Sequence, residues 1–158
     1  MQKITPFLWF DTQAEEAARF YVSVFTNSRI VKTVRYGEAG PGPTGSVMTV
    51  AFELNGVPFT ALNGSPLFHF SEAVSFVVNC QSQPEVDALW EKLSAGGEPG
   101  RCGWLKDKYG LSWQVVPTVL PVLLSDPDAA KAQRTMEAML KMDKLDIAAL
   151  EKAHSGPA

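Results

Sequence analysis

Hydrophobic and polar positions in the first 64 residues predict a strand, a helix and three further strands. Residues 4–10 are rich in aromatic and β-favouring side chains and predict the first strand. Apolar residues then recur at helical spacing to about residue 26, with Asp11 or Thr12 as the expected N-cap. Three later segments have the composition of strands: residues 29–36, 47–54 and 57–62. Asn55-Gly56 predicts a hairpin turn between the last two.

The same order of elements begins again after a loop. Residues 74–79 are apolar and predict a strand, and residues 84–93 carry apolar side chains at helical spacing before Gly96-Gly97 ends the helix. One or two short strands follow, with a turn at residues 108–110 and a final strand at residues 111–116. The second half therefore repeats the β-α-β-β-β order of the first.

The two halves can be superposed by sequence. An offset of 69 places residues 7–24 on residues 76–93 without a gap, and an offset of 54 places Gly56 on Gly110 and Thr60 on Gln114. We therefore predict an α+β fold, a single domain of two tandem β-α-β-β-β modules. The predicted parts are module one at residues 3–64, module two at residues 73–117 and a C-terminal helical extension at residues 118–156.

The pattern changes to helical spacing beyond Pro117. Pro121 and Pro127 predict a turn, Asp126 or Asp128 caps a helix to about Met142, and Asp146 begins a last helix. Four residues form the apolar face of the longer helix: Ala132, Met136, Met139 and Leu140. We interpret this face as core packing or a subunit contact, with a ligand surface as the alternative.

The composition indicates which classes of partner and which cellular location to expect. The formal net charge of -3 and the absence of a run of Lys or Arg argue against nucleic acid and membranes as partners. The first residues do not resemble a signal peptide, and no apolar run approaches the ~20 residues that span a bilayer. Two cysteines are too few for a disulfide framework, so a cytoplasmic location is expected. Cys80 reads as a small buried hydrophobe, and Cys102 as a more exposed thiol without an identifiable base.

The sequence does not contain the motifs of several other kinds of active site. A methyl-donor or dinucleotide site needs a glycine-rich turn that leads into a helix, whereas the glycines of residues 37–45 alternate with prolines and lead into a strand. No nucleophile elbow is present. Asp107 and Lys108 fall in a predicted turn and read as solvated charges.

Four segments resemble PhnB-like members of the vicinal-oxygen-chelate (glyoxalase/bleomycin-resistance) superfamily: residues 5–25, 68–80, 102–120 and 132–153. The most specific of them is CGWLKDKYGLSWQ, at residues 102–114. Such proteins often carry the label of a 3-demethylubiquinone methyltransferase domain, which we do not read as an activity. The resemblance implies paired modules, a curved sheet around a cavity, and a homodimer.

The resemblance also implies where a metal would bind. In metal-using relatives, His or similar residues of each first strand and Glu residues of each last strand hold one divalent ion. These positions fall on Thr5 or Pro6, Val74 or Ser75, Thr60 and Gln114. None is His or Glu, so we predict no metal and no cofactor. His69, in the loop between the modules, and His154, near the end of the chain, do not replace the missing ligands.

The alternation of strand residues predicts the face that lines the cavity. Leu8 and Phe10 are expected against the helix and the alternate residues toward the cavity. The expected cavity residues are Thr5, Phe7, Trp9, Thr60, Leu62, Phe76, Trp104 and Gln114. This apolar, aromatic set with a few neutral polar groups is typical of a small-molecule site. The same pattern also fits aromatics that fill the sheet interior or a dimer interface.

Two functions remain open from the sequence. The first is a metal-free protein that binds a small apolar or aromatic molecule in the cavity. The second is an enzyme of the same superfamily, a metal-dependent lyase or dioxygenase with displaced ligands, or a metal-free enzyme that uses Gln114, Thr60 and Cys102.

Overall fold

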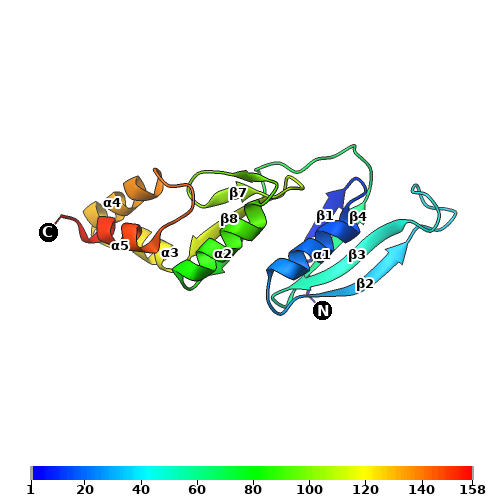
Figure 1. Cartoon of the computed structure of the whole chain (residues 1–158), viewed down its shortest axis with the longest axis horizontal. Coiled ribbons are helices and arrows are strands. Elements are labelled where there is room, and N and C mark those ends of the chain that lie inside the picture. The colour runs from blue at the N-terminus through cyan, green and yellow to red at the C-terminus, as the bar shows by residue number, and fades with distance from the viewer. Residues whose placement is uncertain (1, 158) are drawn as a thin grey trace. The chain divides into compact units, whose positions relative to one another are not determined.

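The computed structural model describes residues 2–157, which divide into two compact units, residues 2–70 and 71–157. Each unit contains a four-stranded mixed sheet with a helix on one face, and the second also carries the C-terminal helices (Figure 1). This is the predicted α+β architecture of tandem β-α-β-β-β modules. No helix among residues 2–157 is long and apolar enough to cross a membrane.

The first unit has five elements: β1 (Phe7–Phe10), α1 (Ala14–Val24), β2 (Arg29–Arg35), β3 (Val47–Leu54) and β4 (Val57–Asn63). The sheet order is β1-β4-β3-β2, with β1 parallel to β4 and the other neighbours antiparallel. Leu8 and Phe10 are buried, as expected for the helix side of β1, together with Phe52 and Phe59 of β3 and β4. The first strand begins at Phe7, three residues later than predicted.

The expected caps of α1 are wrong. Gln13 is the N-cap and makes no side-chain cap hydrogen bond. The backbone N–H of Ala14 instead donates to Oδ1 of Asn63 at 2.8 Å, and the amide of Asn63 donates to the carbonyl of Val47 at 3.1 Å. A side chain 49 positions away therefore satisfies one of the helix's unpaired donors, which local sequence does not indicate.

The second unit repeats the order with shorter middle strands: β5 (Ser75–Cys80), α2 (Gln83–Ser94), β6 (Glu98–Pro99), β7 (Trp104–Lys106) and β8 (Ser112–Pro117). The sheet order is β5-β8-β7-β6, with β5 parallel to β8. Ser82 caps α2 by accepting from the N–H of Glu85, while the Glu85 carboxylate accepts from the N–H of Gln81. This arrangement resembles a capping box, except that the Glu85 carboxylate accepts from the residue before the N-cap.

Asp107, which we expected to be a solvated charge, is 2% exposed. Its Oδ1 accepts from the N–H groups of Tyr109 and Leu111, at 2.8 and 3.1 Å. Its Oδ2 accepts from the indole N–H of Trp113 at 2.9 Å. The carboxylate thus joins the turn before β8 to a buried ring of β8, which explains why a charged residue is buried here.

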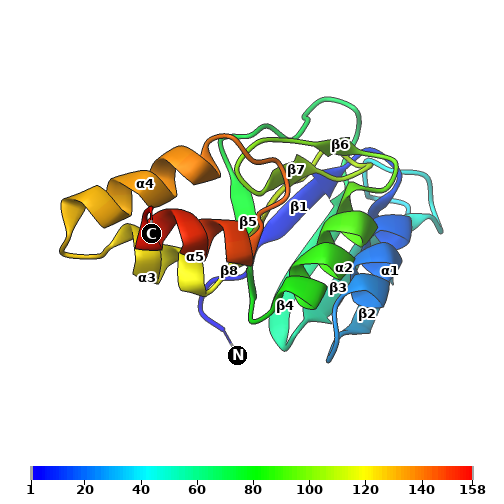
Figure 2. The ribbon, with the colours of Figure 1, turned by 60° about the vertical axis from the view of Figure 1, so that its left-hand side comes forward.

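The extension consists of α3 (Val119–Leu124), α4 (Ala129–Met139) and α5 (Ile147–Ser155), which lie together in Figure 2. The turn that Pro121 and Pro127 were expected to bracket begins only at Ser125, because Pro121 itself lies in the first turn of α3, where its missing N–H costs no helical hydrogen bond. Asp128 and Asp146 cap α4 and α5, and α4 ends at Met139 rather than near Met142.

A leucine cluster joins the extension to the second sheet. Leu120, Leu145 and Leu150 are buried together, and Val116 of β8 and Met139 of α4 pack against them. Met136 and Leu140 are 40% and 56% exposed. Of the expected apolar face of the long helix, Met139 therefore faces the core, while Met136 and Leu140 face solvent.

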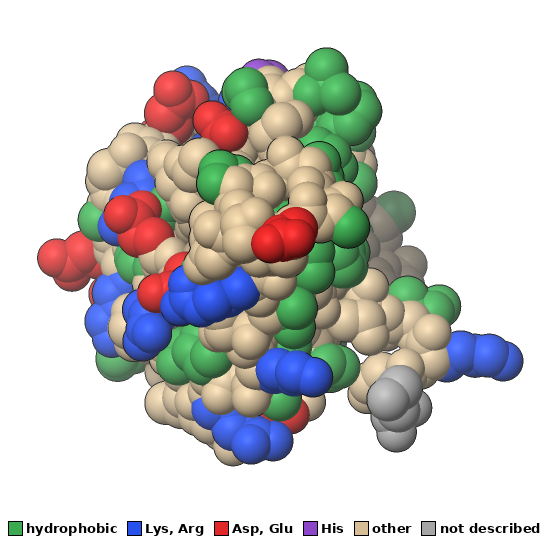
Figure 3. All heavy atoms as spheres, turned by 90° about the vertical axis from the view of Figure 1, so that its right-hand side faces the viewer, with side chains coloured by type: hydrophobic (Ala, Val, Ile, Leu, Met, Phe, Trp, Pro, Cys, Tyr) green, Lys and Arg blue, Asp and Glu red, His purple; other side chains and the backbone are tan. Residues whose placement is uncertain are grey.

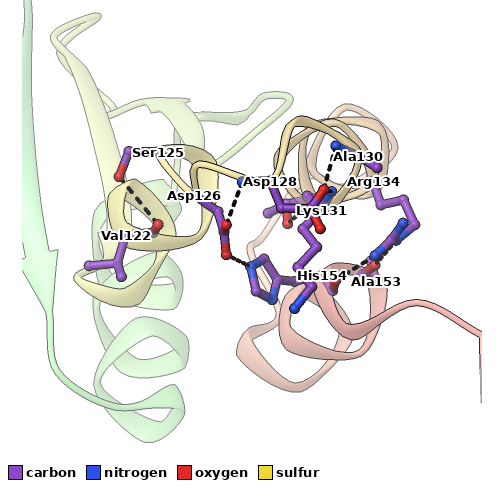
Figure 4. Close-up of polar contacts among 10 residues, drawn as sticks. Val122, Ser125, Asp126, Asp128, Ala130, Lys131, Arg134, Ala153 and His154 are labelled. Carbon is purple, nitrogen blue, oxygen red and sulfur yellow. Dashed lines mark hydrogen bonds and ion pairs between the residues drawn. The ribbon is translucent and has the colours of Figure 1, made fainter.

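Two polar contacts hold the end of α5 (Figure 4). Nε2 of His154 lies 2.8 Å from Oδ2 of Asp126, in the turn between α3 and α4. Nε and Nη2 of Arg134 donate to the carbonyls of Ala153 and His154, at 3.1 and 3.0 Å. His154, set aside in the sequence as a tail residue, is therefore part of the structure of the extension.

Candidate functional site

The face of the second sheet opposite α2 carries a polar and aromatic group. Gln114 lies opposite Trp104 of β7 and opposite Val77 of β5. Side chains that are paired across neighbouring strands share a face. The two flanking residues of β8, Trp113 and Val115, are buried on the α2 side. Gln114 and Trp104 therefore lie together on what we call the open face.

Ser75, Ser112 and Gln114 form the polar part of this face. The amide of Gln114 donates to the hydroxyl of Ser75 at 2.9 Å, and Ser75 lies opposite Ser112 in the parallel pair of β5 and β8. Ser112 is 1% exposed, and its Oγ has no hydrogen-bond partner among the described residues. A buried hydroxyl without a partner costs free energy, so a bound polar group or a water here would be stabilised.

A charged pair lies beside this group. Lys106 of β7 is opposite Ser112, and its ammonium forms an ion pair with Glu72. The hydrogen bond between them lowers the pKa of Glu72 and raises the pKa of Lys106. The pair was not predicted, because Glu72 belongs to the loop before β5 and only the fold brings it to β7.

The extension borders the open face at one end. Val116 follows Gln114 by two residues on β8, so the alternation of strand residues would place it on the same face. It packs instead against Leu120, Leu145 and Leu150. We therefore limit the candidate site of the second unit to Trp104, Gln114, Ser75 and Ser112.

The open face of the first sheet carries the other predicted residues. Phe7 lies opposite Thr60, and Trp9 opposite Leu62. Phe7 is 59% exposed. Thr5 is exposed and precedes β1, so it belongs to no strand. The register therefore places Phe7, Trp9, Thr60 and Leu62 together on this face and leaves Thr5 outside it.

Trp9 is partly covered by the loop that follows β4. Its indole N–H donates to the carbonyl of Ser65 at 2.8 Å, and its ring meets Phe68 edge to face with centroids 5.0 Å apart. Gly64 allows this contact, since a Cβ there would lie 2.2 Å from Cε2 of Trp9. Trp9 is thus held in one orientation, with its polar atom already bonded.

The placement of Phe76 on the cavity face is wrong. Phe76 lies opposite Trp113, and their rings are 5.7 Å apart, on the side of the sheet that α2 covers. Thr60 and Gln114 are equivalent, so the residue equivalent to Phe7 is Val77, 70 positions on, which is 50% exposed. The offset of 69 holds for the helices, but a shift of one residue reverses every side chain of a strand.

The donors at the expected ligand positions do not suit a divalent metal. Thr60 and Gln114 offer neutral oxygens, and their strand neighbours Phe7 and Val77 offer none. Within residues 2–157, no three His, Cys, Asp or Glu side chains come close enough together to hold a metal ion. The metal centre implied by the superfamily therefore does not fit these residues.

The other candidate reactive side chains are one histidine and two cysteines. His69 is exposed in the loop after β4. Cys102 has a φ of 59°, and its N–H donates to the carbonyl of Met142, next to the extension. Cys80 is buried at the end of β5, as predicted, and burial raises the pKa of its thiol to about 11.

Comparison with known proteins gives the family. The model of the family described as 3-demethylubiquinone-9 3-methyltransferase matches residues 2–116. A solved structure described as a putative 3-demethylubiquinone-9 3-methyltransferase, PhnB protein, from Bacillus cereus is 41% identical. The similarity covers 74% of this chain and 100% of that one, with a TM-score of 0.67. This chain belongs to the PhnB-like family. It is thus a member of the vicinal-oxygen-chelate superfamily, as the sequence resemblance implied.

Two more distant structures share the fold alone with this PhnB-like chain. Protein PA1353 from Pseudomonas aeruginosa is 20% identical over 74% of this chain and 98% of its own, with a TM-score of 0.61. The fosfomycin resistance protein FosX from Listeria monocytogenes is 16% identical over 77% of this chain and 96% of its own, with a TM-score of 0.51. No curated protein matches the chain significantly.

Proposed function

We propose that this PhnB-like chain is a metal-independent binding protein for a small, largely apolar or aromatic molecule that carries a neutral hydrogen-bonding group. The observation that carries the proposal is the open face of the second sheet, where Trp104 lies opposite Gln114 and both side chains are partly exposed, while Ser75 also lies on this face. An indole offers a flat apolar surface to a ligand. A carboxamide and a hydroxyl each both donate and accept hydrogen bonds.

The donor chemistry favours binding over metal-assisted catalysis. The positions that would hold the metal carry Thr60 and Gln114, whose neutral oxygens are poor ligands for a Lewis-acidic ion. The transferase in the family's name is not part of the proposal. The glycine-rich loop leads from β2 into β3, so it does not deliver a helix N-terminus to a methyl donor.

The proposal extends to the first sheet and to the oligomer. Phe7, Trp9, Thr60 and Leu62 form a second surface, which is mainly apolar. The homodimer implied by the family, whose subunits would cover exposed side chains such as Phe7 and Val77, is also proposed.

A cytoplasmic location accords with the two free cysteines. On the face drawn in Figure 3, basic and acidic side chains are intermixed, which gives no support to a nucleic-acid partner.

Titration with 1-naphthol, a neutral aromatic with one hydroxyl, tests the site. We expect a saturable change in tryptophan fluorescence that Gln114→Ala weakens at least tenfold. Gln133→Ala, which removes the same group from an exposed position of α4, is the matched control and should leave the titration unchanged. Equal affinity of the Gln114 variant and the wild type would place any binding elsewhere.

Metal analysis separates this proposal from the enzymatic alternative. Protein purified without chelators should carry no stoichiometric divalent ion and should bind 1-naphthol equally with and without added Mn²⁺ or Zn²⁺. A tightly held ion at one per chain would refute the metal-independent proposal and favour a lyase or dioxygenase with displaced ligands. Light scattering of the same preparation measures whether the chain is a dimer.

A further inference from the structure

The extension contains a groove that belongs to none of the surfaces above. It has a volume of about 440 Å³ and lies between α4 and α5. The family model ends at residue 116, and the Bacillus cereus structure is matched in full by 74% of this chain. The groove is therefore formed entirely by residues outside the matched family region.

Three cations line the groove in a chain whose formal net charge is -3. They are Arg134 and Lys141 from the α4 side and Lys152 from α5, and the only carboxylate among the lining residues is that of Glu137. Neither Lys141 nor Lys152 is part of an ion pair within residues 2–157. The groove thus concentrates three positive charges, which the one lining carboxylate offsets only in part.

Arg134 is held in a fixed position in this groove (Figure 4). Its Nε and Nη2 atoms donate to the last carbonyls of α5, so Nη1 remains for a ligand. Gly156 makes the approach possible. Its φ of 82° suits glycine, and a Cβ there would lie 2.9 Å from Nη2 of Arg134. A guanidinium held in this way is a better anion receptor than a freely rotating one.

The remaining lining is small and apolar. Ala138 of α4 and Ala149 and Ala153 of α5 are among its residues, and Ala149 and Ala153 are one helical turn apart. Methyl groups leave room between the helices where longer side chains would fill it. A volume of about 440 Å³ is within the range of small-molecule sites, and a short alkyl chain would bury these methyl groups from water.

From this combination we infer that the groove between α4 and α5 binds a small amphiphilic carboxylate, with its acid group at Arg134, Lys141 and Lys152 and its alkyl chain over the three alanines. The ligand differs in charge from the neutral molecule proposed for the open face, and the two sites share no residue. The inference therefore stands or fails separately from the proposed function.

Decanoate is a suitable probe, with decanol as its uncharged counterpart. Titrated into the full chain, decanoate should bind saturably and decanol at least tenfold more weakly. Lys141→Glu with Lys152→Glu should weaken decanoate binding at least tenfold. Lys32→Glu with Lys92→Glu is the control, because it changes the net charge equally and Lys92, like Lys152, lies in the last turn of its helix. The control should bind within twofold of the wild type.

Alanine methyl NMR locates the probe. The signals of Ala138, Ala149 and Ala153 should shift with decanoate, while those of Ala17 and Ala61, buried in the first unit, should not. Ala153→Leu, which fills the groove without changing its charge, should also abolish binding. Equal affinity in the charge-reversed variant, equal binding of decanol, or shifts confined to the first unit would overturn the inference. An acidic peptide that binds this groove more tightly than decanoate would overturn it in favour of a protein partner.

Discussion

The carboxamide of Gln114 donates a hydrogen bond to the hydroxyl of Ser75 across the parallel pair of β5 and β8. At the equivalent place in the first unit, Thr60 lies opposite Phe7, and Thr5, the counterpart of Ser75 at the strand offset of 70, is exposed and precedes β1. The two modules therefore have similar backbones but different open faces, one with polar groups and one mainly apolar.

Ser112→Ala should stabilise the protein. The hydroxyl of Ser112 is buried without a partner among the described residues, so its removal recovers a desolvation cost of about 1 kcal/mol. Ser75→Ala is the matched comparison and should destabilise, because it leaves the amide of Gln114 without its acceptor. Urea unfolding of both variants measures the effect. A loss of stability in Ser112→Ala would show that the hydroxyl is bonded in solution.

Asp107→Ala should destabilise by about 3 kcal/mol, since it leaves three donors of the turn and of Trp113 without their buried acceptor. Asp107→Asn should not rescue the loss, because its amide nitrogen would face either the indole N–H or the backbone N–H groups. Chemical unfolding measures both, and Lys108→Ala, at the exposed neighbouring position, is the control. Full stability of Asp107→Asn would contradict this account of the turn.

Gly64→Ala should destabilise by about 2 kcal/mol, because its Cβ would overlap the indole of Trp9 and force the ring away from the carbonyl of Ser65. The tryptophan emission should change as the ring moves. Gly37→Ala provides the control, since a Cβ at Gly37 meets nothing within 4 Å. If the two variants were equally stable, the loop after β4 would not hold Trp9 as described.

The contact of Asp126 with His154 predicts a pH effect. The backbone N–H of Asp128 and then His154 lower the pKa of Asp126 below its ordinary value of 3.8. A carboxyl whose folded-state pKa is lowered adds stability above its unfolded-state pKa, and this stability is lost as the pH falls through the folded-state value. Asp126→Asn should therefore lose less stability than the wild type between pH 7 and pH 3. Thermal unfolding across this range, with Asp143→Asn as a control for net charge, measures the difference.

The two thiols should differ sharply in reactivity. Burial and the nearby charge of Glu85 raise the pKa of Cys80 to about 11, so at pH 8 about one thiol in a thousand is ionised. Cys102 is half-buried and should react with a disulfide reagent in the native state. Cys102→Ser should remove the fast reaction and Cys80→Ser should retain it. A fast reaction that survives in Cys102→Ser would mean that β5 opens.

The sequence predicted some features of the internal repeat and missed the register of β5. The order of the elements along the chain and the helix offset of 69 were both predicted, because apolar periodicity indicates which elements form and which faces are buried. The register of β5 was not, since three residues connect β1 to α1 but only two connect β5 to α2. That single deletion moves Phe76 to the helix side and Val77 to the open face. Both residues are apolar, so the sequence offers no contrast that reveals the shift.

The sequence by itself determined the tandem modules, the family, the hairpin turns and the buried Cys80, because each depends on local pattern or residue identity. Only the tertiary structure decided which polar groups meet: Asn63 at the start of α1, Asp107 beneath Trp113, Glu72 beside Lys106, and Gln114 with Ser75. These partners are separated in the chain by loops, and a hydrogen bond requires angstrom-scale placement that composition and periodicity do not record. The prediction of a metal-free protein thus rests on residue identity, whereas the residues of the candidate binding face depend on the register of β5 against β8.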